Sequence, residues 1–185
     1  LGTVTYNDGK RVLGFGHSFF NLGPVSMPMA AGEVLMVLSS QFQPNKFANA
    51  TSVAGALRQD RHSGIMGELG VTADTIPVTL KVITEPEPGA PTHQKDYHFN
   101  VFVHPKWTPF LMMLTAYNTL QDINSAAADE ATYQLTGRVE FDGLPTLQVS
   151  NTVAAGEGPM PAPMQIGAWW ADKFNRLFQN SHAQP

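Results

Sequence analysis

One histidine stands where an imidazole could act as a general base. His17 ends an extended run of residues, directly before a segment rich in glycine and proline. Glycines flank it at positions 14 and 16. They leave the imidazole uncrowded and let other backbone come close. Neutral imidazole titrates near working pH, as a general base must. A histidine that is hydrogen-bonded at the end of a strand is the plainer interpretation of the same pattern.

A carboxylate and a serine follow in one turn further along the chain. Asp60 could orient the His17 ring, as the carboxylate of a catalytic triad does. It could equally be a turn residue paired with Arg61. Ser63 lies beside a glycine in this turn, where a serine is more typical of a turn former than of a nucleophile. Ser18 is next to His17, but neighbours on a strand point to opposite faces, so it is a poor nucleophile for that base.

Metal and cofactor chemistry has little support. Asp96, His98 and His104 have even spacing on an expected strand over 95–104 and share a face. Asp-x-His is half of a zinc site, but no third ligand stands at a convincing spacing, so a solvated strand face is favoured. The chain has no cysteine, which excludes disulfides, thiolate metal sites and cysteine nucleophiles. No glycine-rich phosphate loop joins a strand to a helix. We therefore expect neither a metal nor a cofactor.

The composition excludes several classes of protein. Apolar residues make up 43% of the chain and charged residues 14%, whereas a disordered chain needs high charge and low hydrophobicity. The net charge is −4, from 11 Lys and Arg against 15 Asp and Glu. A general nucleic-acid surface needs clustered basic residues and is not expected. No stretch reaches the roughly 20 apolar residues of a membrane span.

Most of the elements that must position these residues are short strands. Asp-Gly turns between extended runs predict two hairpins, around residues 7–10 and 142–143. Clean alternation predicts a strand over 76–84. The segment 18–28 holds two prolines and is predicted to be rich in turns. A strand or a short helix is predicted over 33–39.

Two segments have helical spacing instead. The first is predicted over 109–124, with Thr108 as N-cap and Pro109 in the first turn. The second is predicted over 164–179, after a linker rich in glycine and proline, and its apolar stripe includes a pair of tryptophans. That pair is most simply a packing anchor for the helix.

Together these elements predict a mainly β fold with an antiparallel core, a barrel or a sandwich, built from residues 2–104 and 132–152 with two added helices. We expect a β-barrel domain over 1–152, with helix 109–124 inserted, and a linker with a C-terminal amphipathic helix over 153–185. The first strand begins almost at the first residue. An upstream N-terminal segment of the same protein, or another copy, is therefore expected to cover that side.

Four short motifs in the first half of the chain carry a family resemblance. In order, these are G-T-V-T at 2–5, G-H at 16–17, G-I-M-G at 64–67 and I-P-V at 76–78. The chain resembles the SpoIVB-type serine peptidases, and among them the large bacterial homologues. The resemblance implies a trypsin-like double β-barrel, a peptide substrate and His17 as the catalytic base. Asp60 is the candidate carboxylate.

One family segment is missing from the sequence. The family's nucleophile lies in a G-[MT]-S-G-S-P segment, which these 185 residues do not contain. In the larger homologues that segment precedes the G-T-V-T strand. The resemblance therefore implies a part of a serine endopeptidase whose nucleophilic serine lies elsewhere, and this chain alone is expected to be inactive. We expect an extracytoplasmic protein, periplasmic or secreted.

Two other classes of function stay open. A non-catalytic structural or protein-interaction module that retains the peptidase fold would explain the missing nucleophile, the low charge and the aromatic C-terminal helix. A β-sandwich that binds a sugar or another small ligand has only Trp107, Trp169 and Trp170 in its favour.

Overall fold

The chain divides into two compact units. The computed structural model describes residues 2–85, 92–123, 131–156 and 158–181. The units are Leu1–Thr75 and Ile76–Pro185. The predicted division, between residues 152 and 153, is different. The C-terminal helix packs on the first helix and on the last hairpin, so it belongs to the same unit as both.

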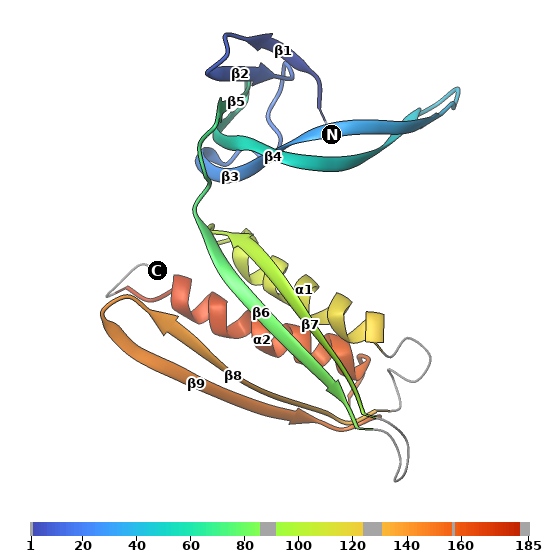
Figure 1. Ribbon diagram of the computed structural model, residues 1–185, viewed down its shortest axis with the longest axis vertical. Coiled ribbons are helices and arrows are strands. Elements are labelled where there is room, and N and C mark those ends of the chain that lie inside the picture. The colour runs from blue at the N-terminus through green and yellow to red at the C-terminus, as the bar shows by residue number, and fades with distance from the viewer. Residues whose placement is uncertain (1, 86–91, 124–130, 157, 182–185) are drawn as a thin grey trace. The chain divides into compact units, whose positions relative to one another are not determined.

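The N-terminal unit is a five-stranded antiparallel sheet (Figure 1). Its strands are β1 (Val4–Asn7), β2 (Arg11–Gly14), β3 (Gly23–Leu38), β4 (Asn45–Arg61) and β5 (Gly64–Leu69). They lie in the order β1-β2-β5-β4-β3, and each neighbouring pair is antiparallel. The mainly β, antiparallel class is confirmed. β1 and β3 are open edges, and no sheet within the described residues closes into the predicted barrel.

The long strand β3 corrects the prediction of a turn-rich segment over 18–28. The strand begins at Gly23 and contains both Pro24 and Pro28. An edge strand tolerates proline because its outer side needs no backbone N–H donor, and β3 is an edge. Its pairing with β4 shifts register just after Pro24. The segment 33–39, predicted as a strand or a short helix, continues β3 to Leu38.

The first predicted hairpin joins β1 to β2. Gly9 in its turn has a φ of 84°, the left-handed region that favours glycine. The Asp8 carboxylate accepts the backbone N–H of Arg11 at 2.6 Å and that of Lys10 at 2.9 Å. These hydrogen bonds hold the pKa of the Asp8 carboxyl below its ordinary value.

The C-terminal unit combines two strand pairs with two helices (Figure 1). Its elements are β6 (Thr75–Thr84), β7 (His93–Phe102), α1 (Trp107–Ile123), β8 (Tyr133–Phe141), β9 (Leu144–Val153) and α2 (Ala162–Phe178). β6 pairs with β7, and β8 pairs with β9. α1 packs on α2 and β7, while α2 also packs on β8 and β9. Both predicted helices and the second Asp-Gly hairpin are confirmed. Neither helix, among the residues described, has the length and apolar character needed to cross a membrane.

The start of α1 differs from its prediction. The helix begins at Trp107, so Thr108 lies inside it and is not the N-cap. The Thr108 hydroxyl donates to the carbonyl of Phe102 at 2.9 Å and accepts the N–H of His104 at 2.7 Å. These two bonds satisfy a completely buried hydroxyl. Thr108 therefore ties the helix to the end of β7.

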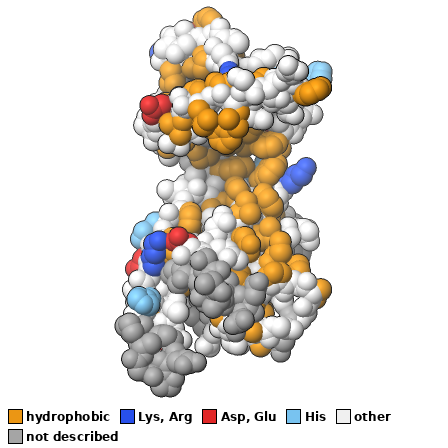
Figure 2. All heavy atoms as spheres, turned by 90° about the vertical axis from the view of Figure 1, so that its right-hand side faces the viewer, with side chains coloured by type: hydrophobic (Ala, Val, Ile, Leu, Met, Phe, Trp, Pro, Cys, Tyr) orange, Lys and Arg blue, Asp and Glu red, His pale blue; other side chains and the backbone are white. Residues whose placement is uncertain are grey.

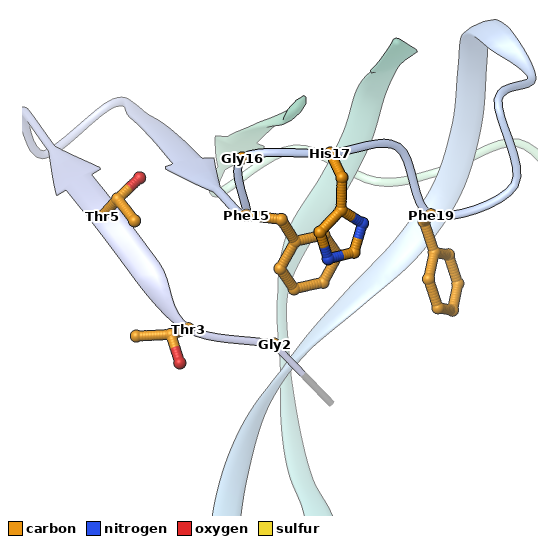
Figure 3. A pocket seen from close by; sticks show the side chains of 7 residues that line it. All are labelled: Gly2, Thr3, Thr5, Phe15, Gly16, His17 and Phe19. Atoms are coloured by element: carbon orange, nitrogen blue, oxygen red, sulfur yellow. The ribbon is translucent and has the colours of Figure 1, made fainter. Parts of the chain in front are cut away.

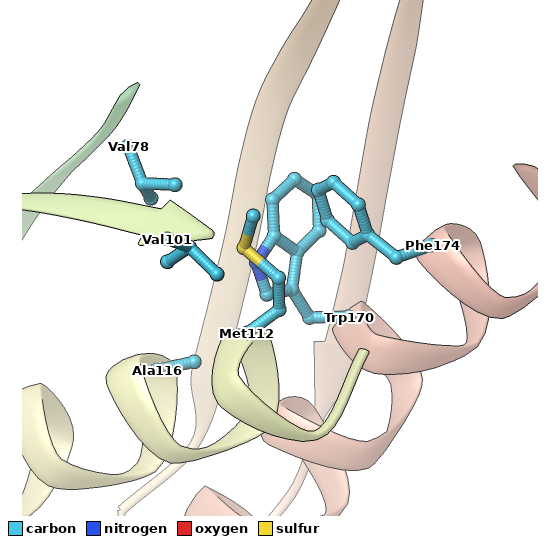
Figure 4. Close-up of a cluster of buried hydrophobic side chains, with 6 residues drawn as sticks. All are labelled: Val78, Val101, Met112, Ala116, Trp170 and Phe174. Atoms are coloured by element: carbon cyan, nitrogen blue, oxygen red, sulfur yellow. The ribbon is translucent and has the colours of Figure 1, made fainter. Parts of the chain in front are cut away.

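A hydrophobic core lies where the helices meet the β6–β7 pair (Figure 4). Its buried members are Val78, Val101, Met112, Ala116, Trp170 and Phe174. Met112 is 0% exposed. Trp170 and Phe174 meet edge to face, with ring centroids 5.0 Å apart, a favourable arrangement for aromatic pairs. Trp170 is thus a packing residue, as the spacing of the last helix indicated.

Candidate functional site

His17 lies in the loop of residues 15–22, between β2 and β3, with its side chain exposed (Figure 3). Phe15 stacks on the imidazole, with ring centroids 5.1 Å apart and ring planes 13° from parallel. Phe15 has a φ of 55° and Asn21 a φ of 57°. An aromatic residue such as phenylalanine rarely adopts this left-handed region, whereas asparagine tolerates it. These two left-handed residues lie on either side of His17 in the loop.

The position of the Phe15 ring requires a glycine at residue 2, the first residue of the G-T-V-T motif. The ring of Phe15 occupies the space that a Cβ atom at position 2 would need. Any side chain there must displace the ring on which His17 stacks. Because Gly2 has no side chain, the Phe15 ring has room to stack on the imidazole of His17.

The hydrogen bond of His17 fixes its tautomer. Nδ1 lies 2.6 Å from the carbonyl oxygen of Ser18. A carbonyl oxygen can only accept, so Nδ1 carries the proton. In the neutral ring Nε2 then holds the lone pair. This is the protonation pattern that a general base requires.

A cavity of about 430 Å³ opens beside the imidazole. Its lining residues are Gly2, Thr3, Thr5, Phe15, Gly16, His17 and Phe19 (Figure 3). No lining residue except the histidine is titratable, and Phe19 is 45% exposed. Of the lining residues, Gly2 and Thr3 precede β1 and Thr5 lies in it, and β1 is one of the two edge strands of the sheet.

Asp60 is buried and binds the backbone of the His17 loop. Only 2% of the residue is exposed. Its Oδ1 accepts the N–H of Phe19 at 2.6 Å, and its Oδ2 accepts those of Phe20 at 2.7 Å and Leu22 at 3.2 Å. Burial raises the pKa of the carboxyl, but the backbone N–H groups outweigh it, so the pKa lies below its ordinary value. Asp60 is therefore an anion that anchors the loop.

This placement differs from both predictions for Asp60. The carboxylate is directed to the loop backbone, whereas the Nδ1–H of His17 is taken by the Ser18 carbonyl. Arg61 does not pair with Asp60 either, because its Nε donates to Gln59 at 2.8 Å. The structure brings Asp60 and His17 into one loop system without direct contact between their side chains.

Neither candidate serine is engaged by the imidazole. Ser63 lies in the turn between β4 and β5, and Ser18 is half-buried in the loop. Within the described residues, His17 forms a hydrogen bond only with the carbonyl of Ser18 and with no serine hydroxyl. The expectation that both serines are badly placed for His17 agrees with this geometry.

Comparisons of the chain with protein-family models, with curated proteins and with solved structures find no match.

Two features of the site were missed by sequence reasoning. One is Phe15 as the stacking partner of the imidazole, and the other is the loop backbone as the partner of Asp60. The available signal was Asn21 followed closely by Gly23, two residue types that favour positive φ and so indicate a tightly folded loop.

The Asp-x-His strand forms no metal centre among the described residues, where no group of three potential ligands occurs. His98 Nδ1 lies 3.2 Å from the hydroxyl of Thr79. The Nδ1 of His104 accepts the backbone N–H of Lys106 at 3.1 Å, beside the start of α1. Burial, with the charge of Lys106, lowers the pKa of His104. These histidines have local structural partners.

Proposed function

We propose that this chain is part of a serine endopeptidase of the SpoIVB type. His17 is the general base, and the nucleophilic serine lies on a segment outside these 185 residues. The observation that carries the proposal is the hydrogen bond from Nδ1 of His17 to the Ser18 carbonyl, because it leaves Nε2 free to take a proton. The order of the four short motifs along the chain supports the same family.

The chemistry follows from this tautomer. Nε2 of His17 takes the proton of the serine hydroxyl while the serine oxygen attacks the carbonyl carbon of the scissile peptide. The imidazolium that forms keeps its Nδ1–H bond to the Ser18 carbonyl. It then gives the Nε2 proton to the leaving amine, and the acyl-enzyme is hydrolysed by water in a second, analogous cycle. Backbone N–H groups beside the serine would hold the negative oxygen.

The five-stranded sheet is proposed to be one part of a trypsin-like barrel. Its two edge strands, β1 and β3, carry backbone groups that another strand can pair with. An upstream segment of the same protein, or another copy, is the proposed partner at these edges. An extracytoplasmic location, periplasmic or secreted, belongs to the same proposal.

An apolar arm favours a second candidate function, a non-catalytic interaction module. The distal part of the β3–β4 hairpin exposes a run of large apolar side chains, and Figure 2 shows apolar side chains gathered at the surface of the N-terminal unit. They are Val34, Leu35, Met36, Val37, Leu38, Phe42 and Phe47. Phe42 is 97% exposed. Exposed apolar surface of this extent typically marks a protein interface.

Cleavage by the chain and by the longer protein separates the two candidates. We expect the 185-residue chain to leave a quenched fluorescent casein intact, because Ser18 and Ser63 are not engaged by His17. A longer protein that carries the G-x-S-G-S-P segment should cleave the same substrate. If the longer protein is also inert, the interaction module is favoured. Hydrolysis by the isolated chain would contradict the proposed division of the catalytic residues.

A further inference from the structure

One peptide group connects Asp60 to His17. The carbonyl oxygen of Ser18 accepts the Nδ1–H of the imidazole, with 2.6 Å between the two atoms. The next backbone N–H, that of Phe19, donates to Oδ1 of Asp60, also at 2.6 Å. This carbonyl and this N–H are the two ends of a single planar, conjugated amide. The carboxylate, the peptide group and the imidazole thus form one continuous hydrogen-bonded chain.

We propose that Asp60 is a positioning residue for His17 and acts through the Ser18–Phe19 peptide group. A carboxylate that accepts the amide N–H draws electron density toward the carbonyl oxygen, because hydrogen bonds in a chain polarise one another. The Ser18 oxygen then becomes a stronger acceptor for Nδ1–H of His17. The tautomer with a free Nε2 is favoured, and the imidazolium formed in catalysis is stabilised. The catalytic meaning of this link rests on the proposed function.

The charge of Asp60 is available for this role. Among the described residues it forms no ion pair, and its hydrogen-bond partners are the loop N–H groups. The neighbouring cations on β4 are engaged elsewhere: Arg58 Nε donates to Glu68 at 3.3 Å, and Arg61 Nε to Gln59 at 2.8 Å. A buried carboxylate without a cationic partner is costly unless N–H groups compensate it. Its negative charge is therefore directed into the loop.

Among the described residues, the cavity beside the imidazole has no second charged side chain in its lining. The remaining residues that line the cavity are glycine, threonine and phenylalanine. The aromatic face against His17 is that of Phe15. Of the charged residues on β4 and β5, Arg61 hydrogen-bonds to Gln59, and Arg58 pairs with Glu68. Asp60 is thus the carboxylate that the described hydrogen bonds connect to His17.

The test is a change of Asp60 to Asn, with the tautomer of His17 as the readout. The amide keeps one oxygen, but its NH₂ group replaces an acceptor with a donor that faces a loop N–H. In the wild-type chain we expect ¹⁵N NMR spectra to show neutral His17 mainly protonated at Nδ1. In Asp60→Asn this tautomer should cease to be the major form. Asp8→Asn is the matched control, because Asp8 also caps backbone N–H groups in this unit but has no link to His17.

A second measurement needs no variant. When His17 of the wild-type chain is protonated, the carboxyl ¹³C resonance of Asp60 and the amide proton of Phe19 should shift with it, while the carboxyl of Asp8 does not follow. If Asp60→Asn does not fold, this titration of the wild-type chain tests the link between Asp60 and His17 by itself. Folded Asp60→Asn with an unchanged tautomer, or an Asp60 resonance indifferent to His17, would overturn the proposal. Both readouts are independent of cleavage, so failure of the peptidase assay remains a separate result.

Discussion

Replacing His17 with alanine in a longer protein that carries the G-x-S-G-S-P segment is expected to lower peptide cleavage by roughly 100- to 10,000-fold, because a general base contributes about that much. The fold should be almost unaffected. The side chain is exposed, and its hydrogen bond and its ring stacking both involve its own loop. Such substitutions usually change the free energy of unfolding by less than about 0.5 kcal/mol. Initial rates on a peptide substrate and a thermal unfolding curve measure the two effects.

His62 provides the matched control for this experiment. It is an exposed histidine of the same unit, in the turn between β4 and β5, and it has no proposed role. His62→Ala should therefore cleave at the wild-type rate. Retained cleavage in His17→Ala would remove His17 from the mechanism, and a large loss of stability would mean that the residue is mainly structural.

Replacing Met112 with alanine is expected to reduce the free energy of unfolding of the C-terminal unit by about 2–5 kcal/mol. The side chain is 0% exposed and packs among Val101, Trp170 and Phe174. Its removal loses buried apolar area and leaves a cavity between the helices. All three tryptophans of the chain belong to this unit, so urea unfolding followed by tryptophan fluorescence reports on it selectively.

Met160→Ala is the comparison for Met112→Ala. Met160 is 44% exposed in the same unit, so the same chemical change should cost well under 1 kcal/mol there. Equal losses for the two variants would mean that the buried cluster does not stabilise this unit. The location of the core, and with it the packing role of Trp170, would then be wrong.

Local signals predicted the strands and helices well, but not their assembly. The Asp-Gly turns and the alternation over 76–84 depend on neighbouring residues, and β1, β2, β6, β8 and β9 follow them. The proline-bearing strand β3 was missed because proline is permitted there only by its edge position. An edge position depends on strand order, which local periodicity does not contain. The two-unit division likewise arises from helix packing between distant segments.

The candidate site was predicted in part. His17 could be selected because its residue type, the extended run before it and the nearby glycines are all local properties. The predicted strand end was wrong in detail, because β2 ends at Gly14 and His17 lies in the loop that follows. The hydrogen-bond partners of Asp60 could not be predicted from the sequence. Its carboxylate accepts backbone N–H groups, and every residue except proline offers one. The stacking of Phe15 depends on a left-handed backbone that is unusual for phenylalanine. Both features depend on the three-dimensional structure of the loop, which the local sequence pattern does not specify.

The central claim is that His17 activates a serine that these 185 residues do not contain. A fluorophosphonate probe, which reacts with activated serines, tests it most directly on the longer protein, with the labelled residue located by mass spectrometry. We predict one labelled serine, outside this chain, and loss of labelling in His17→Ala. The absence of labelling in the wild-type protein, labelling of Ser18 or Ser63, or unchanged labelling in His17→Ala would contradict the account.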